Sequence, residues 1–185
     1  MTFYTVNGIL KRCLPILFIV SFISISTGQM LNLKIDTLVD IPALLILIPP
    51  FIKVGGNTSS TLSARLSTAL HTGIADSAYK YIVFKNNLIA IFTIGISALF
   101  LLSILVYFIS GYMGIGIEFF KLLKICLGAG IITLILIYSL TIIVTLVSYK
   151  YGVDPDDTVI PIVTTIADFM GVAGIFIALH ILGIT

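Results

Sequence analysis

The sequence carries very little charge for its length. Only 10% of its 185 residues are Asp, Glu, Lys or Arg, whereas 59% are hydrophobic. A soluble domain of this size has about 25% charged residues, and its single core is too small to hide so much apolar surface. The scarcity of charge therefore excludes a water-soluble protein and predicts an integral membrane protein that uses the lipid bilayer as part of its solvent.

Basic clusters and paired cysteines are missing as well. The formal net charge is only +2, and no run of Lys and Arg could follow a phosphate backbone, so no nucleic-acid partner is expected. The two cysteines, Cys13 and Cys126, lie in apolar runs and lack the spacing of a metal site. We expect both of them only to pack.

Five apolar runs are long enough to cross a bilayer as helices, which takes about 20 residues each. They are too long and too evenly apolar for the alternating strands of a membrane barrel. The expected fold class is therefore all-α: a bundle of five transmembrane helices in one membrane domain (residues 14–185), after a short cytoplasmic amino terminus (residues 1–13). The expected spans are Leu14–Leu31, Leu38–Val54, Leu88–Ser110, Leu122–Val147 and Val159–Leu182.

The first run has the flanks of a secretory signal peptide. Lys11 and Arg12 precede it, and Ser24-Ile25-Ser26 could serve as a small-residue cleavage site. We expect a retained helix instead, because the family resemblance described below needs this segment as a first span.

The distribution of basic residues predicts a multi-pass protein of the cell membrane with a cytoplasmic amino terminus and an external carboxyl terminus. Lys53 is expected near the end of the second span. With this orientation, six basic residues are cytoplasmic and three are external: Lys11, Arg12, Arg65, Lys80, Lys85 and Lys150 against Lys34, Lys121 and Lys124.

The second span is rich in residues that break helices. It contains Pro42, Pro49 and Pro50, and is expected to end at Gly55-Gly56-Asn57. Such a break either supplies carbonyl ligands for an ion or is a kink that only helps packing. One helix from Leu38 to His71 would be ~51 Å long at ~1.5 Å per residue, so we expect the second helix to be kinked and to extend into the cytoplasm.

One carboxylate, Asp168, is expected near the middle of the bilayer. An ionised Asp at that depth costs ~2.5–3.5 kcal/mol even on the lenient insertion scale. No Lys or Arg is expected at the same depth on another span, so the carboxylate needs a bound cation or a wet cavity. The alternative is a protonated Asp that is hydrogen-bonded to a neighbouring helix.

Asp168 belongs to a polar stripe on the fifth span. Asp157, Pro161, Thr164, Asp168 and Gly171 follow steps of four and three residues, which places them on one helical face. The stripe has the Asp157 carboxylate at the membrane boundary, the Thr164 hydroxyl along its length and the Asp168 carboxylate near the middle of the bilayer. Gly171 leaves space for water or a partner helix. Oxygen ligands of this kind suit a hard cation such as Mg²⁺. Four residues of the fourth span either line the same pathway or join helices together: Tyr138, Thr141, Thr145 and Ser148.

Two passages together resemble the membrane domain of MgtE-type transporters and of solute carrier family 41. The first is the proline-bearing span that ends at residues 55–57, followed by the run at residues 62–69. The second is Asp-Pro-Asp-Asp at residues 154–157, then Pro-Ile at residues 161–162, then Asp168. The Arg-Leu-Ser-Thr-Ala run and the Asp-Pro-Asp-Asp opening look closer to the solute carrier branch. The resemblance covers essentially the whole chain.

The resemblance implies Mg²⁺ transport through a pathway between two copies of a five-helix unit. Asp168 would be the acidic ligand of the fifth helix, with Thr164 one turn before it. Asp154 would be the acidic residue at the cytoplasmic entry, and Asn57 the asparagine that ends the second helix. Two Asp168 carboxylates would meet around one partly hydrated Mg²⁺. The ion is the transported substrate, and no cofactor is expected.

Two departures from the family pattern affect the expected assembly. MgtE-type proteins usually carry cytoplasmic sensor domains ahead of the spans, whereas the amino terminus expected here is short (residues 1–13). Eukaryotic members of the solute carrier branch have two five-helix units in one chain. This sequence has one unit and shows no internal duplication, so we expect a homodimer or a heterodimer with a sister half.

Three alternative functions stay open at this point. The same oxygen ligands would serve a sodium-coupled exchanger as well as a channel. A non-conducting assembly subunit would have no need of Asp168. An intramembrane enzyme could act on a lipid phosphate through a metal held by Asp154, Asp156 and Asp157, but that chemistry usually also needs a base or a cationic clamp.

Overall fold

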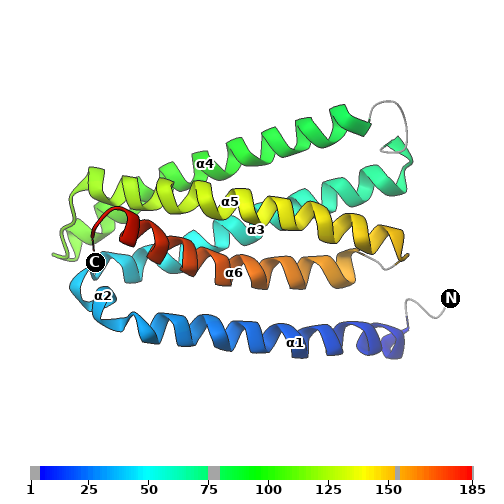
Figure 1. Cartoon of the computed structure of the whole chain (residues 1–185), viewed down its shortest axis with the longest axis horizontal. Coiled ribbons are helices and arrows are strands. Elements are labelled where there is room, and N and C mark those ends of the chain that lie inside the picture. Colours follow the sequence, from blue (N-terminus) through cyan, green and yellow to red (C-terminus); the bar gives the residue numbers. More distant parts are fainter. Residues whose placement is uncertain (1–4, 75–79, 153–154, 185) are drawn as a thin grey trace.

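The computed structural model describes residues 5–74, 80–152 and 155–184, and the regular structure within these ranges is helical, without strands. Five helices are long and one, α2, is short (Figure 1). Their bounds are α1 Val6–Leu33, α2 Ile35–Asp40, α3 Ala43–His71, α4 Lys80–Tyr112, α5 Phe119–Lys150 and α6 Pro155–Ile181. The prediction of an all-α chain is confirmed.

The long helices form an up-and-down bundle. Successive long helices run in opposite directions, so the two termini lie at opposite ends of the molecule (Figure 1). Helix α6 packs against α3 and α5, and α3 also packs against α4 and α5. Helix α1 packs mainly on α6. The centre of the bundle therefore consists of α3, α5 and α6, and α1 lies at its periphery.

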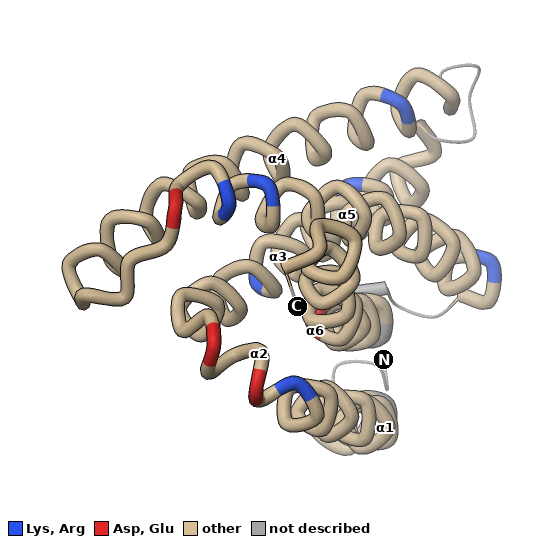
Figure 2. Tube along the Cα trace, turned by 60° about the vertical axis from the view of Figure 1, so that its left-hand side comes forward, with Lys and Arg blue, Asp and Glu red and all other residues tan. Residues whose placement is uncertain are grey.

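Four helices have the length and composition of membrane spans: α1, α4, α5 and α6. Large apolar side chains project from them away from the bundle, for example Phe18, Leu101, Phe108 and Ile143, each more than half exposed. A water-soluble protein rarely exposes so much contiguous apolar surface. Most charged positions lie near the ends of the helices (Figure 2). The prediction of a membrane protein with long apolar helices is confirmed.

Helix α3 is continuous where the sequence predicted a break. It passes through Pro49, Pro50 and the Gly55-Gly56 pair without ending, and the chain turns instead at Pro42, which caps the helix. Residues 55–57 therefore do not end the helix, and the predicted helical extension to His71 is present. The physical reason is tertiary packing: the two glycines face Ala167, Thr164 and Asp168 on α6, and α3 packs along that helix through this segment.

Hydrogen bonds between polar side chains join α5 to α3. Tyr138 donates its hydroxyl hydrogen to Thr58 Oγ1 at 2.8 Å, and the Ser63 and Thr145 hydroxyls are 3.0 Å apart. All four side chains are buried. For Tyr138 and Thr145, the structure thus favours a role in joining helices over one in lining a pathway.

The run at residues 62–69, which the sequence places in the cytoplasm, is also hydrogen-bonded to the bundle. Arg65 donates from Nε to the side-chain oxygen Oδ1 of Asn87 on α4, and Asn87 Nδ2 in turn donates to the backbone carbonyl oxygen of Val83. Cys126 is fully buried and donates to the Leu99 carbonyl oxygen, which agrees with the prediction that it packs. Cys13 is half-buried on α1.

Candidate functional site

Helices α3 and α6 approach closely because small residues face each other. A Cβ atom added at Gly56 would lie 3.8 Å from Thr164 Cβ and 3.9 Å from Asp168 Oδ1. A Cβ atom added at Gly171 would come within 2.9 Å of Ile52 Cγ2, which is closer than real contacts allow. The space that the sequence predicted at Gly171 is therefore taken by a partner helix, α3.

Asp168 forms an ion pair across this contact. Lys53 Nζ on α3 lies 3.0 Å from Asp168 Oδ2 and 3.3 Å from Oδ1. The expectation that no basic residue shares the depth of Asp168 is therefore wrong. It failed because the sequence placed Lys53 only by its distance from the end of a span, whereas α3 packs along α6 and brings Lys53 beside the middle of that helix.

The ion pair lies on the outside of the single chain, not in its core. The side chain of Lys53 is 60% exposed and that of Asp168 is 26% exposed. Asp168 is at the middle of α6 (Pro155–Ile181), far from both ends of the bundle. Charged side chains at such a depth in membrane proteins normally face the interior of a bundle or a water-filled cavity.

Thr164 lies one turn before Asp168 on the same face of α6, as the sequence predicted, and both residues face Gly56. Its hydroxyl donates to the carbonyl oxygens of Ile160 and Pro161, at 2.8 and 3.2 Å. Because the hydroxyl hydrogen is used inside the helix, a lone pair of Oγ1 is free to face a ligand.

Asn57 is exposed on α3, four residues after Lys53 and so on the same helical face. It does not end the helix, contrary to the role that the resemblance implied. Its backbone carbonyl oxygen accepts hydrogen bonds from Ser60 and Thr61. The structure thus brings four residues of the α3 and α6 faces into one region: Lys53, Asn57, Thr164 and Asp168.

Of the two remaining predicted ligands, only Asp157 lies within the described residues. Asp157 is in the first turn of α6, where the side chain is not described, and Asp154 lies outside the described residues. Eleven residues separate Asp157 from Asp168, which is about 16 Å along a helix. Asp157 therefore belongs to the end of the bundle and cannot share a coordination sphere with the Asp168 of its own chain.

A single chain does not supply a complete metal site in its described part. No group of three or more His, Cys, Asp or Glu side chains that could hold a metal ion occurs among the described residues. Mg²⁺ is commonly bound through only one or two carboxylates and keeps several water molecules. The donors around Asp168 suit such an ion only if a second carboxylate comes from outside the chain.

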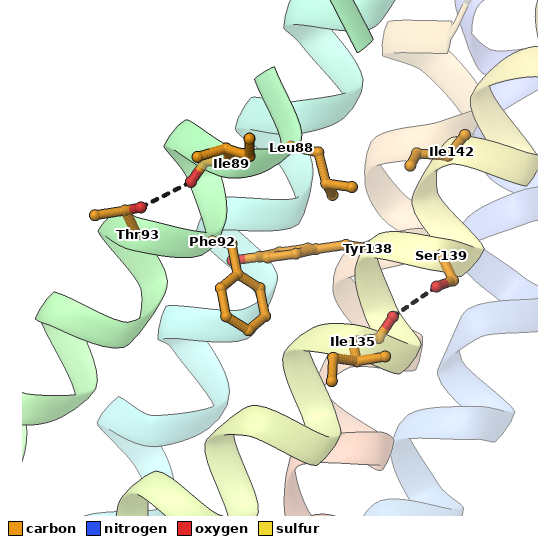
Figure 3. Close-up of a pocket in the computed structure, with 8 residues that line it drawn as sticks. All are labelled: Leu88, Ile89, Phe92, Thr93, Ile135, Tyr138, Ser139 and Ile142. Carbon is orange, nitrogen blue, oxygen red and sulfur yellow. Dashed lines mark hydrogen bonds between the residues drawn. The ribbon is translucent and has the colours of Figure 1, made fainter. Parts of the chain in front are cut away.

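A cavity around Tyr138 lies away from this ion pair. It has a volume of about 360 Å³, opens between α4 and α5, and is lined mainly by apolar side chains around Tyr138 (Figure 3). Thr93 and Ser139 at its wall bond their own helices, to the carbonyl oxygens of Ile89 and Ile135. The cavity lining has no charged group and does not suit a cation.

The MgtE family, described as a divalent cation transporter, matches residues 48–178. This match covers well over half of the chain and includes both Lys53 and Asp168. The chain belongs to the MgtE family. It is also similar to solute carrier family 41 member 3 of Rattus norvegicus, with 28% identity over 136 residues, and to the Mus musculus protein of the same name, with 27% identity.

The aligned segment is 71% of this chain but only 29% of the rat protein and 28% of the mouse protein. The aligned part of the chain thus spans less than a third of the length of these curated relatives. No solved structure matches it. The family match begins at Ile48 on α3 and leaves out α1, which packs mainly on α6.

Proposed function

We propose that the protein moves a divalent cation, most favourably Mg²⁺, across the membrane along a pathway between two copies of this chain or between it and a sister half. The observation that carries the proposal is Asp168, a mid-helix carboxylate on the outer surface of a bundle that belongs to the MgtE family. Membership of the family supports the substrate class, and the position of Asp168 supports its role as the intramembrane ligand.

The energetic argument for a second subunit starts from the exposed ion pair. In a lone chain, Lys53 and Asp168 would face lipid, where charged groups are costly. A second copy placed over this face would remove both from lipid and bring another Asp168 carboxylate near the first. Two carboxylates neutralise one divalent cation, and Thr164 and Asn57 add neutral oxygen donors beside them.

In this proposal α3 is the fifth crossing of the membrane. Helix α1 ends at the side of the bundle where α3 begins, and α4 begins at the side where α3 ends (Figure 1). If α1 and α4 both cross, α3 must cross between them, with its Ser- and Thr-rich half extending into the cytoplasm. The amino terminus is then cytoplasmic and the carboxyl terminus external, with Asp154 and Asp157 at the cytoplasmic entry.

The test is Mg²⁺ uptake into liposomes that contain the purified chain and an internal Mg²⁺ dye. We expect uptake by the wild type and its loss in Asp168→Asn, which removes the charge but nearly keeps the shape. Asp40→Asn is the matched control, since Asp40 is exposed on the short helix α2 at the end of the bundle. Equal uptake by wild type and Asp168→Asn would refute the assigned ligand.

Two further outcomes of this assay separate the mechanisms. Uptake that requires an opposing Na⁺ gradient would indicate an exchanger, and uptake without one a channel. If the wild type conducts no ions in any gradient, the chain alone is not the transporter, and the proposed homodimer is replaced by a pair with a sister half.

A further inference from the structure

Lys53 occupies the position beside Asp168 that a metal ion would need. Its ammonium nitrogen lies within hydrogen-bond distance of both carboxylate oxygens, 3.0 and 3.3 Å away, so it sits between them as a chelated cation would. It is the one salt-bridge partner that Asp168 has in the described part of the chain.

The lysine side chain is able to leave this position. It is 60% exposed, so neighbouring atoms hold less than half of its surface in the single chain. An ammonium on a flexible four-carbon stem acts as a mobile point charge, unlike the rigid planar guanidinium of Arg. Its departure would free both carboxylate oxygens without any movement of α3 or α6.

Charge balance makes the ammonium and a metal ion alternatives to each other. Two copies of the site contain two carboxylates and two ammonium groups, with no net charge. A divalent cation bound in addition would leave two excess positive charges in a region of low dielectric constant, which is costly. If a divalent cation instead displaces both ammonium groups, the two carboxylates and the bound cation together have no net charge.

We propose that Lys53 is a tethered counter-ion that competes with the transported ion for Asp168. This inference rests on the proposed function. When the site is empty, the two ammonium groups neutralise the carboxylates. One divalent cation has the charge to replace both ammonium groups together. One Na⁺ or K⁺ can replace only one of them, and it must compete with an ammonium group that its own side chain holds permanently near the carboxylate. Lys53 thereby sets the ion concentration that the site requires and disfavours monovalent ions.

The first experiment compares the Mg²⁺ dependence of liposome uptake in the wild type, Lys53→Gln and Lys53→Arg. Removal of the competing charge should lower the Mg²⁺ concentration for half-maximal uptake by about tenfold, the effect that one close charge typically has on the cation affinity of a carboxylate. Na⁺ should inhibit Lys53→Gln more strongly than the wild type. Lys53→Arg keeps the charge and should need more Mg²⁺ than Lys53→Gln.

An unchanged or increased Mg²⁺ requirement in Lys53→Gln would overturn the proposal. A second version of the test avoids any variant that fails to fold. Lys53→Cys in a chain with Cys13→Ala and Cys126→Ala is purified and then treated with aminoethyl methanethiosulfonate, which restores an ammonium group, or with neutral methyl methanethiosulfonate. Only the charged adduct should raise the Mg²⁺ requirement. Equal effects of the two reagents would overturn the proposal as well.

Asp168→Asn distinguishes this proposal from the one on which it depends. If Asp168→Asn abolishes uptake but Lys53→Gln keeps the wild-type Mg²⁺ dependence, only the role of Lys53 fails. If Asp168→Asn transports Mg²⁺ like the wild type, the proposed function fails and the competition at Asp168 is overturned with it.

Discussion

Lys53 on α3 forms an ion pair with Asp168 at the middle of α6, and its Nζ atom lies 3.0 Å from Asp168 Oδ2. The two residues are 115 positions apart in the chain. The pair is formed on the outer face of the bundle, next to the contacts that Gly56 and Gly171 make between these two helices. Both proposals depend on this ion pair, and it has several measurable consequences.

The ion pair should contribute to the stability of the folded chain in detergent. Lys53→Met leaves Asp168 without its cation, and Asp168→Asn leaves Lys53 without its anion. Each single substitution should cost about 1–3 kcal/mol, since an unpaired charge remains in a poorly solvated region. The double variant should lose less than the sum of the two. A strictly additive double-mutant cycle would mean that the pair has no net coupling.

The contact between Gly171 and Ile52 should be intolerant of added volume. Gly171→Ala places a Cβ atom 2.9 Å from Ile52 Cγ2, so α3 and α6 must separate, at a cost of about 1–3 kcal/mol. The melting temperature in detergent measures the loss. Gly128→Ala is the matched control, because no atom lies within 4 Å of its added Cβ.

The control should be neutral or slightly stabilising, since Ala favours a helix over Gly. The double variant Gly171→Ala with Ile52→Ala should recover part of the loss by returning space to the contact. Equal melting temperatures for Gly171→Ala and Gly128→Ala would show that α3 and α6 are not closely packed at this point.

Tyr138 should matter for stability and not for ion selectivity. Tyr138→Phe removes the hydrogen bond to Thr58 and should cost about 0.6 kcal/mol, the average for side-chain hydrogen bonds between membrane helices, and no more than about 1.7 kcal/mol. Tyr112→Phe is the control, because Tyr112 is 95% exposed. If Tyr138→Phe changes the preference for Mg²⁺ over other ions, the hydroxyl lines the pathway instead.

Cross-linking tests whether two copies meet at the ion pair. Asp168→Cys, in a chain with Cys13→Ala and Cys126→Ala, should form a covalent dimer on mild oxidation in the membrane. The reason is that a two-fold axis near this position brings the two copies of residue 168 together. Ile143→Cys, on an exposed apolar face of α5, provides the control and should stay monomeric. A covalent dimer through Ile143→Cys alone would place the interface on another face.

Much of the architecture could be predicted from the sequence because lipid imposes a simple rule on helix length and polarity. The long apolar runs became α1, α4, α5 and α6, and the spacing of Thr164, Asp168 and Gly171 correctly placed them on one face. The second span was harder to predict. Pro49, Pro50 and the Gly55-Gly56 pair all disfavour helix locally, and only the packing against α6 shows why the helix continues.

Lys53 was missed as the partner of Asp168 because the sequence placed it near the end of the second span. A lysine at the end of a span is normally an interfacial residue. The helical spacing of Ser60, Ala64 and Ser67 is consistent with the predicted continuation of this helix, but it does not show that Lys53 lies opposite Asp168. Which helix faces Lys53 depends on tertiary contacts that no local pattern contains.

The measurement that tests the central claim most directly is the stoichiometry of Mg²⁺ binding to the purified protein, by titration calorimetry of the wild type and Asp168→Asn. The account predicts one tightly bound Mg²⁺ for every two chains of the wild type and loss of that binding in Asp168→Asn. Binding of the same strength and stoichiometry in Asp168→Asn would contradict it, because the ion would then be held without the carboxylate that defines the proposed site.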